Sequence, residues 1–422
     1  MKKFKKSLII LLVLALMLPF AACGKKDDAP AKGEEKGESN EAVEVAQGVT
    51  DTEVLVGNSA AVSGAYAPVG APFNGGIEAY FKMINEEGGV NGRQIKFTHI
   101  DDEFDPAKGK AALQTLVNDR KVFAIVGHFG TPVVAATIDD LKEIGIPTVY
   151  FATGIRQMYA ENAQGGEKCI FPVQPIYITE GGIMVSRAVG DFDAKKIGVI
   201  YTNDDAGKDM LEGAKKKAEE LGIELVAEQV AAGATDVSAA VTAIKSADVD
   251  FIIGAAIQGT IGTIVKGLAA QGVDKDVITT YVNTANVIAE QVYGDIQGKF
   301  DVYSNGWVDL AADDGKALEL YQKWVDPQYA DNVYAITGWI AGHYFTEGLK
   351  AVGDKPLTWE NYIEAMGQQK IQNPFGGMID FTEGKRLGTT EMNLSKVADV
   401  QGAPGWELVK PLQSSEDILQ GK

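Results

Sequence analysis

Two successive runs of short apolar segments, alternating with amphipathic segments, dominate this chain of 422 residues. The first run begins with EVLVGN at Glu53 and ends with PTVYF at Phe151. The second run begins after Pro175 and ends with VITTYV at Val282. Apolar strands that alternate with helices are typical of parallel sheets covered by helices on both faces. The pattern therefore predicts an α/β fold of two doubly wound parallel-sheet lobes in tandem.

Segments with helical spacing connect these strands. The predicted helices are residues 73–86, 106–118, 133–144, 180–189, 207–221, 237–247 and 260–271. In parallel sheets of this kind, ligands bind outside the carboxyl ends of the strands. Two such lobes therefore predict a ligand cleft between them.

The N-terminal residues MKKFKKSLIILLVLALMLPFAAC combine a basic start, an apolar run from about Leu8 to Leu18 and small residues before Cys23. This order is typical of a secretory signal peptide, predicted here for residues 1–22. An N-terminal membrane anchor helix is the alternative, but the apolar run is shorter than the ~20 residues that span a bilayer.

The stretch FAACG resembles the lipobox of bacterial lipoproteins, with Ala21 and Ala22 before Cys23. By this resemblance Cys23 carries a diacylglycerol, and two acyl chains hold a protein at a membrane where one chain does not. The resemblance implies an extracytoplasmic protein, lipid-anchored to the cell membrane, in the periplasm or on the outer face. Cys169 would then be the remaining cysteine, which excludes an intrachain disulfide and favours a buried, inert thiol.

Residues 24–48, after the predicted lipidated cysteine, are rich in Lys, Asp, Glu, Gly and Ser and have no aromatic residue. Such a segment buries too little apolar surface to offset its ordering entropy. Residues 23–50 are therefore expected to form a disordered tether.

A cluster of acids follows the predicted strand RQIKFTHI, at Asp101, Asp102, Glu103 and Asp105. Acids of this kind bind metals, but an EF-hand is excluded because its loop glycine and terminal glutamate are missing. Asp105 before Pro106 matches the N-cap and first position of a helix, where proline costs no hydrogen bond. The cluster is interpreted as a junction between strand and helix rather than a metal site.

Several classes of function lack their sequence signals. The net charge of −19, with no basic cluster outside the extreme N-terminus, argues against nucleic-acid binding. The chain has no GxxxxGK[ST] loop, GNSAA lacks the closing glycine of a nucleophile elbow, and the three histidines form no HExxH motif. A Ser–His–acid triad assembled in space stays open, but no local motif indicates one. We expect no enzyme activity, no metal and no cofactor.

Four stretches together point to one family: VSGAYAPVGAPFNGGIEAYFKMINEEGGVNGRQIKFTHIDDEFDP, FAIVGHFGTPV, IPTVYFATG and KKIGVIYTNDDAGKDM. They resemble the leucine/isoleucine/valine-binding protein family, which has the type I periplasmic binding fold of ABC importers. The resemblance covers roughly Thr52 to Trp406. The combination of stretches is specific, whereas any one of them alone is weak.

The family implies two lobes joined by three crossovers that close over a small ligand. The crossovers are expected near residues 171–175, 302–305 and 378–381. Lobe 1 would then comprise residues 51–172 plus 304–378, and lobe 2 residues 173–303 plus 379–422.

The resemblance places the family's carboxylate site on lobe 1. GHFGT puts Thr131 where members use a hydroxyl and a backbone N–H, and YFATG puts Thr153 and the backbone of Phe151 in the second contact segment. Pro132 is expected to open a helix beside Thr131, where free N–H groups and the helix dipole favour an anion. Thr131 as a plain N-cap is the alternative, and the two roles are compatible.

Further candidate contacts lie outside this carboxylate site. Ser63 and Gly64 form the loop after the first strand, and Tyr66 is a candidate pocket wall or a surface packing residue. Trp307 and Trp339 are candidate cleft residues, but packing in the core is favoured for Trp339.

The amine side departs from the family pattern. Ala206 and Ile257 replace aromatic residues of the family, and its ammonium-pairing acid falls near Val282 or Asn283, neither of which is charged. Because a desolvated ammonium without a partner is costly, either Asp204 or Asp205 replaces that acid or the ligand differs from a standard amino acid.

Three polar residues are candidates for a neutral polar ligand at this end: Asn203, Gln258 and Asn283. The disulfide of some members is also missing, because Phe104 and Gly130 stand where its cysteines fall.

The resemblance implies a monomeric solute-binding lipoprotein that delivers a small organic molecule to an ABC permease. The ligand would be branched-chain amino acid-like, a carboxylate or an amide. The alternative is a ligand-sensing subunit for a membrane signalling partner.

Overall fold

The computed structural model describes residues 45–421. These residues belong to one compact unit, Val43–Lys422, which contains its own hydrophobic core. The predicted signal peptide, the lipidation site at Cys23 and residues 24–44 of the predicted tether lie outside the described residues. None of the helices within residues 45–421 is long and apolar enough to cross a membrane.

Lobe 1 is built on a five-stranded parallel sheet with the order β2-β1-β3-β4-β5. Its strands are β1 (Glu53–Ala60), β2 (Gln94–Asp101), β3 (Ala124–Phe129), β4 (Thr148–Ala152) and β5 (Ile170–Phe171). Every residue of β3 is buried, as expected for a strand covered on both faces. The α/β prediction is confirmed for this lobe.

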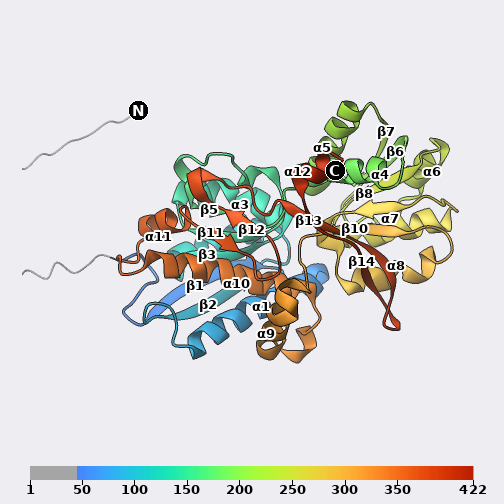
Figure 1. The fold of residues 1–422 in the computed structure, drawn as a ribbon. Coiled ribbons are helices and arrows are strands. Elements are labelled where there is room, and N and C mark those ends of the chain that lie inside the picture. Colours follow the sequence, from blue (N-terminus) through green and yellow to red (C-terminus); the bar gives the residue numbers. More distant parts are fainter. Residues whose placement is uncertain (1–44, 422) are drawn as a thin grey trace, which may run out of the picture. The chain divides into compact units, whose positions relative to one another are not determined.

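Helices from two distant parts of the chain cover this sheet. They are α1 (Ala67–Glu86), α2 (Pro106–Gln114), α3 (Thr131–Ile144), α9 (Lys316–Trp324), α10 (Val333–Val352) and α11 (Trp359–Met366). A Cβ on Gly76 of α1 would lie 1.8 Å from the carbonyl oxygen of Ala335 on α10, so only glycine permits this close approach. Figure 1 shows α10, drawn in orange, beside β1 and β3.

Lobe 2 is built on a seven-stranded sheet with the order β14-β13-β10-β9-β8-β6-β7. Its parallel strands are β6 (Lys196–Thr202), β7 (Glu224–Val230), β8 (Phe251–Ala255), β9 (Val277–Thr279) and β10 (Val302–Gly306). Its helices are α4 (Tyr177–Gly190), α5 (Asp205–Leu221), α6 (Ser238–Ser246), α7 (Gln258–Ala270), α8 (Asn286–Ile296) and α12 (Ser415–Leu419).

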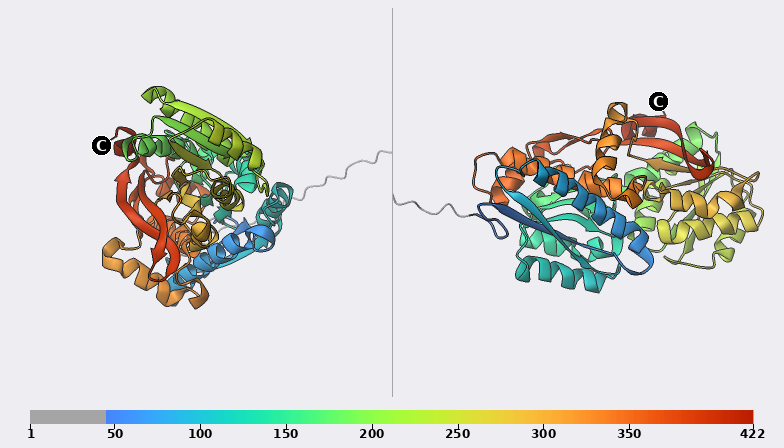
Figure 2. Two further views of the ribbon diagram at one scale, coloured as in Figure 1. Left: turned by 90° about the vertical axis from the view of Figure 1, so that its right-hand side faces the viewer. Right: turned by 90° about the horizontal axis from the view of Figure 1, so that it is seen from below.

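A long antiparallel hairpin of β13 (Glu391–Val400) and β14 (Ala403–Ser414) completes this second sheet. The chain thus enters the sheet of lobe 2 after β5, leaves it after β10 and returns to it at β13. A small hairpin of β11 (Lys370–Gln372) and β12 (Met378–Asp380) precedes this return. In both views of Figure 2 the red hairpin lies beside the green and yellow elements of lobe 2. The residue boundaries of the two lobes stay a prediction.

Helix α1 begins at Ala67, earlier than the predicted start at residue 73, and keeps Pro72 inside it. A proline inside a helix removes a helical hydrogen bond, which disfavours this position for Pro72. In the structure Pro72 is buried. Tertiary packing therefore outweighs the local preference at this position.

The acid cluster after β2 is a structural junction, as predicted. Asp105 is the N-cap of α2, and its carboxylate accepts hydrogen bonds from the N–H groups of Ala107 and Lys108. Asp102 is fully buried and accepts hydrogen bonds from the Ser59 hydroxyl and the Phe104 N–H. Across residues 45–421 no group of three or more His, Cys, Asp or Glu side chains is arranged to hold a metal ion.

Cys169 is a buried thiol, as expected. Its Sγ lies 3.1 Å from the carbonyl oxygen of Gly166, to which it donates a hydrogen bond. Burial raises the pKa of the Cys169 thiol to about 12, so this side chain stays protonated and unreactive at neutral pH.

Candidate ligand-binding cavity

A cavity of about 740 Å³ is lined by elements of both lobes. This volume falls in the range of roughly 300–1,000 Å³ that is usual for pockets of small organic ligands. Lobe 1 contributes residues from the start of α1, from the carboxyl ends of β3 and β4, and from α10. Lobe 2 contributes residues from α4, α7, α8 and the β13–β14 hairpin. The cavity thus lies where the α/β topology predicts a ligand site.

One end of the cavity contains a cluster of hydroxyl groups at the N-terminus of α3. Thr131 is the first residue of this helix, and its Oγ1 lies 2.8 Å from Oγ1 of Thr153. Gly130 is the N-cap, with φ of +92°, so the interpretation of Thr131 as the N-cap is wrong. Thr131 lines the cavity, whereas the side chain of Thr153 is fully buried behind it. The first N–H groups of a helix lack intrahelical acceptors and attract anions.

Tyr177, at the start of α4, completes this hydroxyl cluster from lobe 2. Burial is the main cause that raises the pKa of Tyr177, although hydrogen bonds with Thr153 and Thr131 act in the opposite direction. The phenol therefore stays protonated at physiological pH and is able to donate a hydrogen bond. We define the hydroxyl cluster as Thr131, Thr153 and Tyr177.

A hydrogen-bonded chain links the two lobes beneath the cavity. Gln174, in the first passage between the sheets, donates from Nε2 to the hydroxyl of Tyr150 on β4, at 2.8 Å. Its Oε1 accepts from the hydroxyl of Tyr281 in lobe 2, at 3.2 Å. The ring of Tyr281 in turn stacks on Tyr177, with ring centroids 5.7 Å apart. Gln174, Tyr177 and Tyr281 all line the cavity.

Tyr150 occupies an unusual backbone position beside the cavity. It is a non-glycine residue within β4 and has φ of +65°. Its ring lies 5.6 Å from that of Phe73 and 6.4 Å from that of Trp307, and both of these neighbours line the cavity. Positive φ in a bulky residue is strained and is held only where the surrounding packing determines it.

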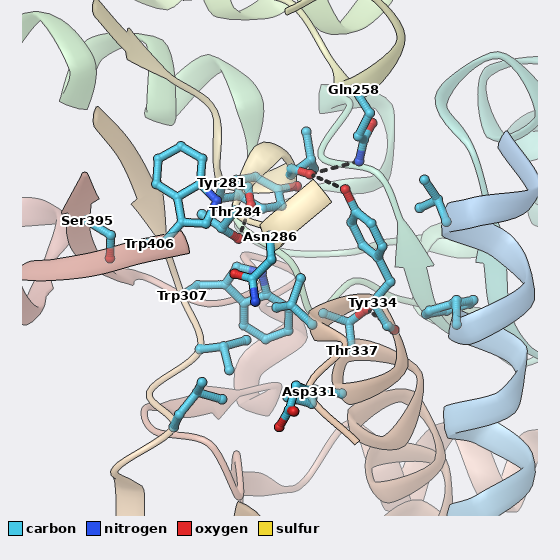
Figure 3. Close-up of a pocket in the computed structure, with 18 of the residues that line it drawn as sticks. Gln258, Tyr281, Thr284, Asn286, Trp307, Asp331, Tyr334, Thr337, Ser395 and Trp406 are labelled. Atoms are coloured by element: carbon cyan, nitrogen blue, oxygen red, sulfur yellow. Dashed lines mark hydrogen bonds between the residues drawn. The ribbon is translucent and has the colours of Figure 1, made fainter. Parts of the chain in front are cut away.

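On another side, the two lobes contact each other across the cavity. The hydroxyl of Tyr334, on α10, donates to the carbonyl oxygen of Val282 at 3.3 Å, and Gln258 Nε2 donates to the same oxygen at 2.8 Å (Figure 3). Tyr66 reaches from lobe 1 to the backbone of Gly259 on α7. Burial, and secondarily the negative charge of Asp204, raises the pKa of Tyr66 to about 12.

Phe104 forms the wall next to Tyr66. The two rings stack with centroids 3.7 Å apart and an interplanar angle of 12°. Phe104 also fills the space beside Gly130, where an added Cβ would lie 2.6 Å from its ring. Phe104 and Gly130, which stand where some family members carry a disulfide, are therefore neighbours here, and the ring of Phe104 packs against Gly130.

Three of the predicted site residues line this cavity: Tyr66, Thr131 and Gln258. Thr153 contacts one of them from behind, and Phe151 is fully buried on β4. Ser63 and Gly64 are exposed in the loop after β1, outside the lining.

None of the remaining predicted residues of lobe 2 lines the cavity, and two of them have structural partners within the lobe. Asn203 is exposed outside the lining. Asp204 is the N-cap of α5 and accepts from the N–H of Gly207 at 2.8 Å. Asn283 is fully buried, and its Nδ2 donates to the carbonyl oxygen of Ala256 and to Thr279 Oγ1, both at 2.8 Å.

Charged groups are scarce in the lining that the structure describes. It contains two carboxylates, Asp309 and Asp331, and no Lys, Arg or His. Asp309 Oδ1 accepts from the N–H of Ala311 at 2.9 Å, and Asp331 Oδ1 accepts from Gln322 Nε2 at 3.2 Å. Figure 3 shows Asp331 away from Gln258 and Tyr281.

Sequence reasoning missed several aromatic residues of the lining: Phe104, Tyr177, Tyr281, Tyr334 and Trp406. Trp307 was a candidate and lines the cavity, whereas Trp339 packs in the core against Tyr80, as expected. A signal for Trp406 was present in residues 391–414, where two alternating segments flank Gln401-Gly402. Both residues have positive φ, which is typical of a two-residue hairpin loop.

Comparison with known proteins identifies relatives over most of the chain. The Leu/Ile/Val-binding protein homolog 1 of Brucella suis is 27% identical over 310 residues, which cover 71% of this chain and 79% of that protein. The Leu/Ile/Val-binding protein homolog 2 of Brucella abortus is 24% identical over 338 residues, covering 78% of this chain and 85% of that protein.

Solved structures share the fold. The fatty acid ABC transporter substrate-binding protein from Thermomonospora curvata superposes with a TM-score of 0.77 and 22% identity, covering 91% of this chain and 97% of that one. A branched chain amino acid ABC transporter protein from Thermus thermophilus with bound valine gives a TM-score of 0.75 and 18% identity, covering 88% and 99%. A family described as periplasmic binding protein matches residues 53–402. The chain therefore belongs to the periplasmic binding protein family.

Proposed function

We propose that this protein is the solute-binding component of an ABC importer and that it binds a small organic carboxylate in the cavity between its lobes. One observation carries the proposal: the hydroxyl cluster and the N-terminus of α3 meet at one end of a cavity lined by both lobes. Hydroxyl donors and free helical N–H groups stabilise a carboxylate without a paired cation.

The names of similar proteins support this proposal and leave the cargo open. The curated relatives are named for leucine, isoleucine and valine, and the two structures for fatty acid and valine. All of these compounds carry a carboxylate, whereas only some carry an α-amine. We propose that this shared group binds at the hydroxyl cluster, and that the ligand's amine, where present, is what distinguishes the possible solutes.

Binding is proposed to draw the two lobes together by hinge motion. Gln174 lies in a passage between the sheets and hydrogen-bonds Tyr150 in lobe 1 and Tyr281 in lobe 2. A ligand held by Thr131 from lobe 1 and Tyr177 from lobe 2 would contact both lobes at once. Such a ligand stabilises the arrangement with the lobes in contact, which is the state a permease is proposed to recognise.

The protein is further proposed to act as a monomer held at the membrane by lipid on Cys23, without catalysis and without a resident cofactor. A lipid anchor of this kind would keep the folded unit close to a membrane-embedded permease.

The experiment that tests the proposal is native mass spectrometry of the unit Val43–Lys422, followed by denaturation to release any retained molecule. We expect a single small carboxylic acid, bound one to one and chemically unchanged. A retained compound without a carboxylate would refute the carboxylate assignment, and a product formed from an added compound would refute the absence of catalysis.

A second measurement tests the lipid anchor. Full-length protein from cells is expected to carry a diacylglycerol on Cys23 and to partition into detergent, whereas a Cys23→Ala variant does neither. Detergent partitioning of both proteins alike would refute anchoring through this cysteine.

A further inference from the structure

The cavity is also lined by a set of large apolar side chains that do not belong to the hydroxyl cluster. We define this apolar annex as Trp307, Leu310, Leu318, Trp406 and Leu408, all of which line the cavity. Trp307 and Leu310 follow β10, Leu318 lies on α9, and Trp406 and Leu408 lie on the edge strand β14. Both lobes therefore contribute to a part of the cavity that has no role in binding a carboxylate.

The two indole rings of the annex are held in place. The indole N–H of Trp406 donates to the carbonyl oxygen of Ala285 at 3.1 Å, which ties β14 to the start of α8. Trp307 is 3% exposed and lies against Tyr150. Figure 3 shows Trp307 and Trp406 on the same side of the cavity, with Asn286 between them. The rings therefore form a preformed apolar wall.

The rim of the annex leaves large aliphatic side chains in solvent. Leu310 is 48% exposed, Leu408 is 55% exposed, and Val400, which also lines the cavity, is 38% exposed. Apolar groups gathered at the edge of a cavity are typical of a surface that a ligand covers. Burial of this surface by an apolar chain is favourable in proportion to the area covered.

The charged residues around the cavity restrict which charged groups the ligand carries. Asp309 and Asp331 are the acids of the described lining, and both accept hydrogen bonds from groups near them in the chain. The residues of the hydroxyl cluster are uncharged, and the lining contributes no acid from α7 or from residues 281–286 of lobe 2. Hydrogen-bond donors for a carboxylate are thus present at one end of the cavity. The described lining has no acid beside them that would pair with an α-ammonium group.

We propose that the solute is a monocarboxylic acid with an apolar chain longer than a branched-chain amino-acid side chain, and that the apolar annex binds the far end of that chain. The inference rests on the proposed function, because it takes the carboxylate to lie at the hydroxyl cluster. It adds the chain length of the ligand and names the residues that select it.

The first test is a chain-length series measured by titration calorimetry on the unit Val43–Lys422, with butanoate, hexanoate, octanoate, decanoate and leucine as probes. The affinity is expected to rise by about fourfold for each methylene group that enters the annex, and then to level off. Leucine is expected to bind more weakly than decanoate, because its chain does not reach the annex and its ammonium lacks a partner.

The second test compares two adjacent substitutions on β14. Leu408→Asp places a carboxylate at the rim of the annex, and Val409→Asp places one at a neighbouring residue that does not line the cavity. Both side chains are exposed, at 55% and 43%, so neither substitution buries a charge. We expect Leu408→Asp to remove most of the gain from butanoate to decanoate and to leave butanoate unchanged, and Val409→Asp to leave both affinities unchanged.

Two results would overturn the inference. One is an affinity that stays constant or falls as the chain lengthens, and the other is an equal loss of decanoate affinity in Leu408→Asp and Val409→Asp. Neither result would refute the proposed function. That function is tested separately by the butanoate affinity of Thr131→Ala. If Thr131→Ala weakens butanoate binding while the series is flat, the proposed function stands and the annex inference fails. If no carboxylate binds, leucine included, both fail.

Discussion

The two lobes contribute to the cavity in different ways. In lobe 1, Tyr66 follows β1 and Thr131 follows β3 as the first residue of α3; both line the cavity and both were predicted from the sequence. In lobe 2, Asn203, Asp204 and Asn283 also follow strands, but none of them lines the cavity. The wall of lobe 2 contains the predicted Gln258, but it consists mainly of residues such as Tyr177 and Tyr281, which no motif indicated.

This difference shows that a polar residue after a strand can either contact a ligand or satisfy backbone groups of the fold. Its burial and its hydrogen-bond partners distinguish these two roles. Asp204 caps a helix, and Asn283 satisfies a buried carbonyl group. These partners are local, so the same residues are needed whether or not a ligand is present. We therefore expect substitutions in lobe 2 to act mainly on stability, and substitutions at Thr131 to act mainly on binding.

The largest expected effect comes from Asn283→Asp. The substitution removes an amide that donates to Ala256 O and Thr279 Oγ1, and it places a carboxylate against the carbonyl oxygen at a fully buried position. We expect the free energy of unfolding to fall by about 3 kcal/mol, measured by chemical denaturation at pH 7.

The matched control for this change is Asn286→Asp, which adds the same charge at an exposed residue that begins α8. An acid in the first turn of a helix is favourable, so stability is expected to change little. If Asn283→Asp is instead neutral and improves leucine binding, Asn283 is a ligand residue and the contrast between the lobes disappears.

The next prediction concerns Glu180, a fully buried carboxyl group of lobe 2 that holds the cavity wall in place. It accepts hydrogen bonds from Thr280 Oγ1 at 2.6 Å, the Tyr281 N–H at 2.8 Å and Asn305 Nδ2 at 3.2 Å. Burial raises its pKa from 4.5 to about 7, although these hydrogen bonds and the charge of Arg187 act in the opposite direction.

Because the folded protein holds this proton more tightly than the unfolded chain, the contribution of Glu180 to stability falls as the pH rises. The fall is expected between about pH 4.5 and pH 7 and amounts to about 3 kcal/mol. The difference in unfolding free energy between the wild type and Glu180→Gln, measured across this range, should show it. Glu360→Gln, at an exposed position, should show no such difference. A flat difference for Glu180→Gln would contradict the prediction.

On the side of lobe 1, Thr131→Ala removes the hydroxyl that lines the cavity at the start of α3. If this hydroxyl contacts a ligand carboxylate, affinity should fall by about 1–3 kcal/mol, measured by titration calorimetry with the acid recovered from the protein. Thr131→Ser keeps the hydroxyl and should retain most of the affinity. Equal affinities of the wild type and Thr131→Ala would remove Thr131 from the site.

The same contrast explains how much of the molecule the sequence predicts. The alternation of strands and helices follows from local periodicity, so the parallel strands of both sheets and the junction at Asp105 were predicted correctly, whereas the antiparallel β13–β14 hairpin of lobe 2 was not. The position of Pro72 inside α1 and the approach of α10 to α1 depend on tertiary packing. The wall of the cavity joins Phe104, Tyr177 and Tyr334, which are far apart in the chain and have no shared spacing. Only their side-chain environment in the folded protein identifies them.

The smallest expected effect tests whether an acid only caps a helix or also pairs with an ammonium group of the ligand. The chain offers a matched pair of helix caps for this test. Asp105 caps α2 in lobe 1, and Asp204 caps α5 in lobe 2. Asp105→Ala and Asp204→Ala should each lower the free energy of unfolding by about 1 kcal/mol, and neither should change ligand affinity. Asp204 also lies close enough to Tyr66, which lines the cavity, for its negative charge to raise the pKa of that phenol. A loss of leucine affinity in Asp204→Ala alone would therefore show that this cap also pairs with an ammonium group, and it would return amino acids to the set of ligands.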